Sequence, residues 1–199
     1  PRGAALFALA RGGRAPWAAH LLWPGRAVPQ GPPFCYGRAM ALIEIAPLTS
    51  LACVLPLRRL AREEGWRFLD RLFDEWASGA ARFSGRGEEM LCARLEGRVA
   101  GVGGLCRDPF AGDRRIGRIR HVYVAPAFRG LGIARALVGS LVADAGAHFT
   151  ALRLVTENPA ADALYRACGF RRAAGDRQTH RLDLAGDSPC PLPIPQTPQ

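Results

Sequence analysis

A glycine-rich stretch at residues 122–134 carries the clearest chemical signal in the sequence. It reads V-Y-V-A-P-A-F-R-G-L-G-I-A: β-branched residues, a proline, an arginine and two alternate glycines. A helix that opens with such glycines leaves its first N–H groups unpaired and unobstructed, at the positive end of the helix dipole. Phosphate fits such a site well. Arg129 before the glycines and Arg135 after them can each offer a guanidinium group to the same anion.

The turn taken alone also fits a tight strand-to-helix connection that binds nothing. It does not fit two common nucleotide motifs. A dinucleotide fingerprint needs a third small residue at position 135, which is Arg, and an acid about 20 residues further on. The acid at the end of the next expected strand is Glu157, which lies too far along the chain. A P-loop needs Gly-Lys-Ser/Thr, which the sequence lacks.

A second motif, at residues 157–170, reads E-N-P-A-A-D-A-L-Y-R-A-C-G-F. The two motifs, in this order and at this separation, closely resemble the GCN5-related N-acetyltransferase (GNAT) family. With the flanking strands the resemblance extends over residues 41–184. It implies an α+β fold: a mixed, mostly antiparallel central sheet flanked by helices, with a V-shaped opening between the two central strands. It also implies transfer of an acetyl group from acetyl-coenzyme A (acetyl-CoA) to a primary amine of a small molecule or a protein, by direct attack.

In that family the pyrophosphate of the co-substrate lies on an Arg/Gln-x-x-Gly-x-Gly/Ala turn. The resemblance assigns this role to Arg129, Gly130, Leu131, Gly132, Ile133 and Ala134, with Arg135 as a further phosphate ligand. Leu131 departs from the family, in which a basic residue is common there. The pantetheine arm would lie along the preceding strand and bond to the backbone of Val122, Tyr123 and Val124.

Asn158 matches the asparagine that bonds the pantetheine in the family, and Tyr165 matches the tyrosine that protonates the departing thiolate. Each also has a purely structural interpretation. Asn before Pro159 is a good helix N-cap, and a tyrosine ahead of Gly-Phe can be a core aromatic. A phenol, neutral at pH 7 with an ordinary pKa of about 10, is a suitable acid for a thiolate.

The base that takes the proton of the amine is not identified by the sequence. Arg120 occupies the strand position that often carries an acid in the family, so His121 and Glu157 are the remaining candidates. His121 can equally be a packed or solvent-facing histidine. On the acceptor side, Glu63, Glu64, Trp66 and Asp70 could attract an amine, although a charge run on a helix is most often a solvated face.

The elements that must position these residues alternate along the chain. Residues 51–78 are expected to be helical, interrupted at Pro56 and Gly65, with Leu69, Leu72, Phe73 and Trp76 on one buried face. Turn signals separate consecutive strands in the middle of the sequence. The expected strands are 42–45, 89–95, 98–106, 116–124 and 152–156, with a last pair within 170–184; the later helices are 130–145 and 159–168. Consecutive strands followed by one strand-helix-strand unit favour an α+β sheet.

Composition points to one domain. The chain has 199 residues and a formal net charge of +10, and all 27 basic residues are arginine. Residues 1–39 hold five arginines and no acid, so half of the net charge lies there. The rest shows no clustered arginines with interleaved aromatics, so we expect no nucleic-acid binding. An RNA- or DNA-binding role would depend mainly on the first 39 residues.

We expect residues 1–39 to be a disordered extension or an artefact, residues 40–185 to be the N-acetyltransferase domain, and residues 186–199 to be a flexible proline-rich tail. A targeting peptide is the alternative for the first segment. The six cysteines lack metal-site spacing, and no apolar run approaches a membrane span. We therefore expect no metal, no membrane association and a cytoplasmic location, with a homodimer left open. The alternative function is a non-catalytic sensor or partner module that binds acyl-coenzyme A.

Overall fold

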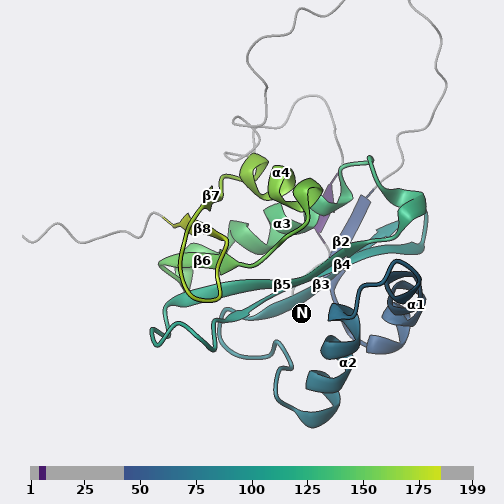
Figure 1. Cartoon of the computed structure of the whole chain (residues 1–199). Coiled ribbons are helices and arrows are strands. Elements are labelled where there is room, and N and C mark those ends of the chain that lie inside the picture. Colours follow the sequence, from purple (N-terminus) through teal and green to yellow (C-terminus); the bar gives the residue numbers. More distant parts are fainter. Residues whose placement is uncertain (1–4, 8–42, 185–199) are drawn as a thin grey trace, which may run out of the picture.

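The structure, a computed structural model, describes residues 5–7 and 43–184. Within them one eight-stranded sheet has the order β1-β2-β3-β4-β5-β6-β8-β7. Helices α1 and α2 cover one face of the sheet, and α3 and α4 cover the other (Figure 1). The strands are β1 (Ala5–Phe7), β2 (Ile43–Pro47), β3 (Glu89–Leu95), β4 (Arg98–Arg107), β5 (Ile116–Val124), β6 (Ala151–Leu154), β7 (Arg171–Arg172) and β8 (His180–Asp183). The helices are α1 (Leu55–Glu63), α2 (Phe68–Ser78), α3 (Ile133–Ala143) and α4 (Pro159–Ala167), with short 3₁₀ helices at Leu51–Val54, Pro126–Phe128 and Ala145–Ala147.

The sheet is antiparallel except where β5 meets β6. That parallel ladder runs from Ile116 opposite Ala151 to Arg118 opposite Arg153, whereas β5 continues to Val124. The predicted mixed, mostly antiparallel sheet flanked by helices is therefore confirmed. The V-shaped opening remains a prediction, and the short ladder is the place where it would begin.

A bulge interrupts the pairing of β4 with β5. The register shifts between Val102 and Gly104, and on the opposite strand His121 has φ 56°, in the left-handed region. A bulge adds a residue to one strand and re-aims the side chains around it. Both Arg120 and His121 consequently contact Glu75 of α2, on the same side of the sheet.

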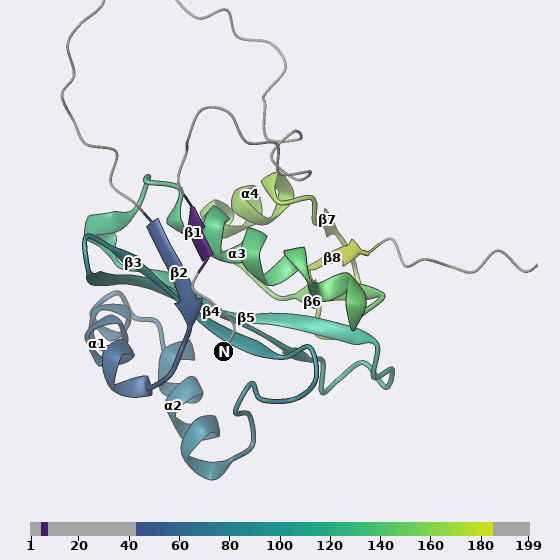
Figure 2. The same ribbon diagram turned by 180° about the vertical axis from the view of Figure 1, so that it is seen from behind.

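Two hydrophobic cores lie on the two faces of the sheet. Figure 2 shows from behind the helices that cover these faces. On one face Leu137, Leu141 and other residues of α3 pack against the strands, with Tyr165 of α4 in the same cluster. On the other, α1 and α2 bury Leu57, Leu69 and Leu72. The predicted stripe on α2 is confirmed, with Phe73 and Trp76 partly buried at its margin.

Some elements match the sequence-based expectation and others differ from it. The predicted strands 89–95 and 116–124 are confirmed to the residue. Pro56 does not interrupt a helix but lies in the first turn of α1, where the missing N–H of proline costs nothing. Strand β1, which pairs with β2, lies in the segment where we predicted no strand. The rest of residues 1–39 and residues 186–199 lie outside the described residues, so the domain boundaries stay a prediction.

Candidate active site

The glycine-rich turn lies between the end of β5 and the start of α3. Our prediction that the glycines form the first helical turn was wrong, because α3 begins at Ile133 with Gly132 as its N-cap. Gly130 and Gly132 have φ values of 78° and 80°, which only glycine adopts readily, and a Cβ on either would meet nothing within 4 Å. The glycines are therefore required by backbone conformation, and the space in front of them is open.

The amide groups of this turn are unpaired. The first hydrogen bond of α3 runs from the Ala136 N–H to the Gly132 carbonyl at 3.0 Å. Among the described residues, the N–H groups of residues 130–135 donate to no partner. An 11-residue helix thus presents its free N–H groups at an exposed turn, with the exposed side chain of Arg135 beside them. Such a set of donors at the positive helix end is suited to an anion.

The end of β5 continues this surface. Ala125 N–H donates to the Ala100 carbonyl of the β4 side at 2.9 Å, whereas the Val124 carbonyl accepts from Arg129 Nε at 3.0 Å. Peptide groups alternate in direction along a strand, so Val122 and Val124 turn theirs away from β4 and Tyr123 turns its own toward it. Of the three strand residues predicted to bond pantetheine, Val122 and Val124 therefore have the appropriate backbone direction.

Arg129 is held by an acid that the sequence did not connect to it. Its Nη1 and Nη2 donate to the two oxygens of Glu64 at 2.6 Å each, and Tyr123 donates its hydroxyl to the same carboxylate at 2.6 Å. The Arg129 bond, with a smaller contribution from Tyr123, holds the pKa of Glu64 below its usual value. Glu64 lies just beyond α1, so this cluster joins the α1/α2 side of the molecule to the glycine-rich turn.

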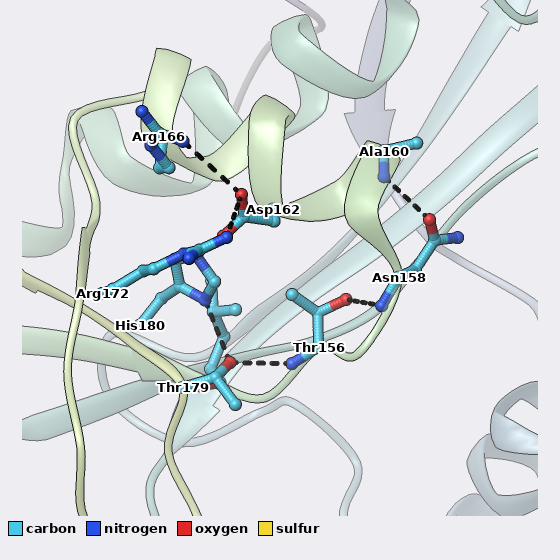
Figure 3. Close-up of polar contacts among 9 residues, drawn as sticks. Thr156, Asn158, Ala160, Asp162, Arg166, Arg172, Thr179 and His180 are labelled. Atoms are coloured by element: carbon cyan, nitrogen blue, oxygen red, sulfur yellow. Dashed lines mark hydrogen bonds and ion pairs between the residues drawn. The ribbon is translucent and has the colours of Figure 1, made fainter.

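Asn158 lies at the N-terminus of α4 and caps it. Its Oδ1 accepts from the Ala160 N–H at 2.9 Å, as the capping interpretation predicted (Figure 3). Because β5 and β6 run parallel, the helices that follow them, α3 and α4, both begin at the same edge of the sheet. The two sequence motifs are thereby brought to one end of the parallel pair.

Tyr165 lies in the last turn of α4 and is 7% exposed. Its ring packs edge-on against Phe170 at 5.7 Å and tilted against His180 at 6.1 Å. Burial raises the pKa of the Tyr165 phenol above its usual value. The side chain is thus both a core aromatic and a hydroxyl that stays protonated across the neutral range.

A network around Asp162 fixes α4 to the last strands, and sequence analysis missed it. Arg172 donates from Nε at 2.7 Å and from Nη2 at 3.0 Å, and His180 Nε2 lies 2.9 Å from Asp162 Oδ1 (Figure 3). These bonds, Arg172 first and His180 next, lower the pKa of Asp162 to about 2. The other nitrogen of His180 lies 2.9 Å from Thr179 Oγ1. Since His180 also touches Tyr165, the network positions the predicted acid.

The candidate bases occupy very different environments. His121 is 7% exposed, its Nδ1 lies 2.9 Å from the Phe68 carbonyl, and burial lowers its pKa. Its Nε2 lies 3.6 Å from Glu75, beyond hydrogen-bond distance. Arg120 donates to Glu75 at 2.6 Å. Contact with His121 and the bond from Arg120 lower the pKa of Glu75 to about 2, which makes Glu75 a weak base. Glu157 is exposed at the other end of the site, beside Asn158.

The acids predicted on the acceptor side are largely engaged. Asp70 accepts from Arg58 and Arg62 at 2.6 Å each, and these bonds, with Arg67, lower its pKa to about 2. Glu63 lies 3.8 Å from Arg59 on an exposed face, and Trp66 is 43% exposed. These acids are therefore not an open cation site, and Glu64 is the one that reaches the glycine-rich turn.

Thiol and metal chemistry find little support in this region. Burial raises the pKa of Cys106 to about 11, so at neutral pH it is a thiol rather than a nucleophilic thiolate. Within the described part of the chain no cluster of His, Cys, Asp and Glu could hold a metal ion. No helix there combines the length and apolar character of a membrane span.

Comparison with known proteins gives a consistent match. The model of the acetyltransferase (GNAT) family matches residues 54–170. An N-alpha-acetyltransferase RimI from Mycobacterium tuberculosis is 36% identical over 83 residues, which are 38% of this chain and 52% of that protein. A Mycobacterium leprae protein is 37% identical over 81 residues, 36% of this chain and 23% of that protein. The chain thus spans about half, or less, of the length of these curated relatives.

Solved structures extend the match to more than two thirds of the chain. A protein of Exiguobacterium sp. 255-15 classed as an acetyltransferase has a TM-score of 0.64 at 30% identity, covering 71% of this chain and 93% of that one. YncA of Salmonella typhimurium, solved with acetyl-CoA, has a TM-score of 0.54 at 19% identity and covers 76% of this chain and 99% of that one. At that identity the second likeness concerns the fold alone.

Proposed function

Because the chain belongs to the acetyltransferase (GNAT) family, we propose that it transfers the acetyl group of acetyl-CoA to a primary amine of a small molecule or a protein. The co-substrate is acetyl-CoA. Its pyrophosphate binds the free amides of residues 130–135, with Arg129 and Arg135 as cationic ligands. The pantetheine arm pairs with the outward-facing backbone of Val122 and Val124, and Asn158 contributes from the neighbouring helix.

The transfer is direct. The lone pair of a neutral amine attacks the thioester carbonyl carbon, the new C–N bond forms, and the C–S bond breaks with its electrons going to sulfur. Tyr165 gives its proton to the leaving thiolate, and the nitrogen loses one proton to water or to a protein base. The protonated state of Cys106 supports a route without an enzyme-bound acyl group.

One observation carries the proposal: the run of unpaired amides ahead of α3, in a conformation that two glycines make possible. A connection that only joined β5 to α3 would not need two left-handed residues and a run of free amides. A backbone that receives phosphate oxygens needs both.

Thermal unfolding with and without acetyl-CoA tests this proposal. A ligand that binds the folded state alone raises the midpoint, and 100 times Kd adds about 2.7 kcal/mol. We expect a rise of several degrees with acetyl-CoA and a smaller rise with acetyl-pantetheine, which has no pyrophosphate. No shift at millimolar acetyl-CoA would contradict the proposed site. A shift without thiol release in the presence of any amine would instead favour the non-catalytic sensor.

A further inference from the structure

A polar cavity lies on the α1/α2 side of the sheet, beyond the stretch of β5 assigned to pantetheine. Its volume is about 310 Å³, at the small end for ligand sites. The loop after α2, the end of β4 and Arg120 of β5 form its walls. Three of the lining residues are arginines, Arg82, Arg107 and Arg120, and one is an acid, Glu88.

The cavity is placed where an acceptor would meet the thioester. Along β5 the order is Arg120, then the bulge at His121, then Val122 and Val124, and finally the turn at Arg129. A co-substrate with its phosphates at Arg129 and its pantetheine along Val124 and Val122 directs its acyl end toward Arg120. The cavity at Arg120 is therefore next to the reacting carbonyl and open to a second molecule.

The charged side chains that line the cavity do not neutralise one another. Both carboxylate oxygens of Glu88 are engaged, since they accept from the backbone N–H groups of Arg107 at 2.9 Å and Gly85 at 3.1 Å. Arg120 is paired with Glu75. In the described part of the chain, the Arg82 side chain has no hydrogen-bond or ion-pair partner, and Arg107 Nε is buried without one. A buried guanidinium N–H without a partner is costly and indicates a missing ligand or water.

We propose, on the basis of the proposed acetyltransferase function, that this cavity selects acceptors that carry a carboxylate close to the amine to be acetylated. Arg82 and Arg107 bind the carboxylate through charge-assisted hydrogen bonds, and the amine then lies toward Arg120 and the thioester. The acceptor is either a free amino acid or a peptide N-terminus with an acidic side chain close by.

The same arginines assist the chemistry of the amine. Positive charge within a few ångströms disfavours an ammonium and so increases the fraction of neutral, nucleophilic amine at pH 7. The carboxylate compensates for the repulsion that a purely cationic acceptor would meet. The bond-making step is the one already written: one N–H proton leaves the acceptor, and the thiol leaves protonated.

Matched acceptors that differ only in this charge provide the test. Initial rates of thiol release at saturating acetyl-CoA would be compared for alanine and alaninamide, β-alanine and β-alaninamide, and peptides with Asp or Asn at the second position. We expect kcat/KM about tenfold higher for the carboxylate member of at least one pair, as a charged hydrogen bond predicts. Preference within the amino acids identifies a small-molecule acceptor, and preference within the peptides alone identifies a protein N-terminus.

The variants Arg82→Gln and Arg107→Gln assign the preference to the cavity. Each should lose most of it, while Arg86→Gln, an exposed arginine of the same loop that does not line the cavity, should keep it. Arg82 is exposed, so that variant should fold, and its thermal midpoint checks this. Equal or faster transfer to the amides in the wild type, or a preference kept in both variants, would overturn the cavity proposal alone. No transfer to any acceptor would overturn the proposed function as well.

Discussion

At the scale of single residues, Tyr165 combines two roles that usually conflict. Its ring fills a position in the core beside Phe170, and its phenol is the predicted proton donor. Burial raises the pKa of the phenol and so keeps the hydroxyl protonated across the neutral range. The same burial fixes the ring, which limits the geometries that the hydroxyl can take.

Replacement of Tyr165 by Phe separates these roles. The ring packing is preserved, so the thermal midpoint and the affinity for acetyl-CoA should change little. Loss of a general acid should lower kcat about 100-fold. Thiol-release kinetics with the best acceptor measure the effect. An unchanged kcat would exclude Tyr165 as the acid, and a lower midpoint would indicate that the hydroxyl has a structural partner.

Glu75 gives a prediction about pH and stability. Contacts with His121 and Arg120 lower its pKa from 4.5 to about 2. The ionised form is thus favoured in the folded state, so its contribution is complete above about pH 4.5 and is lost as pH falls toward 2. Allowing for solvent screening, Glu75→Gln should cost about 2 kcal/mol at pH 7.

Urea unfolding of Glu75→Gln at several pH values measures that contribution. The difference from the wild type should shrink between pH 4.5 and 2. Asp74→Asn removes a neighbouring exposed acid and should show no such dependence. A constant difference across the range would mean that Glu75 stabilises the fold by packing rather than by charge.

Some of these residue roles could be predicted from the sequence and others could not. Asn158 as a helix cap follows from local rules, because the capping bond joins residues two apart. The bond between Glu64 and Arg129 joins residues far apart in sequence, and no local pattern pairs one acid with one arginine among 27. The same holds for Asp162 and His180, which meet only because α4 packs on β8.

At the scale of elements, the N-terminus of α3 shows how a late helix start leaves backbone N–H groups free. The sequence predicted a helix from residue 130, with Gly130 and Gly132 in its first turn. The structure delays it to Ile133, since two left-handed glycines change the chain direction after β5. The strands were easier to predict, as β3 and β5 illustrate. The strand-forming residues and the turn residues that bound a strand are both read from the local sequence.

Two glycines of this region should respond oppositely to alanine. Gly132 has φ 80°, so Gly132→Ala costs about 1–2 kcal/mol of backbone strain and should weaken acetyl-CoA binding. Gly139 lies within α3, and a methyl group added there would meet nothing within 4 Å, so Gly139→Ala should stabilise by about 0.5–1 kcal/mol. Denaturant unfolding and acetyl-CoA titration measure both. Equal effects of the two changes would contradict the role given to the turn.

At the scale of the whole molecule, Glu64 couples the two sides of the sheet. It reaches from the α1/α2 side to Arg129, a predicted phosphate ligand, and both terminal guanidinium nitrogens are occupied. With Nε bonded to the Val124 carbonyl as well, a phosphate at the Arg129 side chain has two free N–H groups to use and lies beside the competing charge of Glu64. The co-substrate and the acceptor side are connected through one carboxylate.

Glu64→Gln tests that coupling. Without the competing charge, Arg129 should be freer for phosphate, and the Kd for acetyl-CoA should fall about threefold to tenfold, equivalent to about 1 kcal/mol. Calorimetric titration at low salt measures it, with Glu63→Gln, the exposed neighbour, as the control. Weaker binding would show instead that Glu64 holds Arg129 in its binding position.

The short ladder between β5 and β6 has a consequence for solubility. Past Arg118, β5 has no partner in β6 among the described pairs, so an edge exists within the sheet rather than at its border. Unpaired edges are where other extended chains add on and aggregation begins. The peptide groups of Val122, which we propose bind pantetheine, are equally open to a strand from a second copy, whereas the Val124 carbonyl already accepts from Arg129. Acetyl-CoA bound there would also protect the protein from self-association.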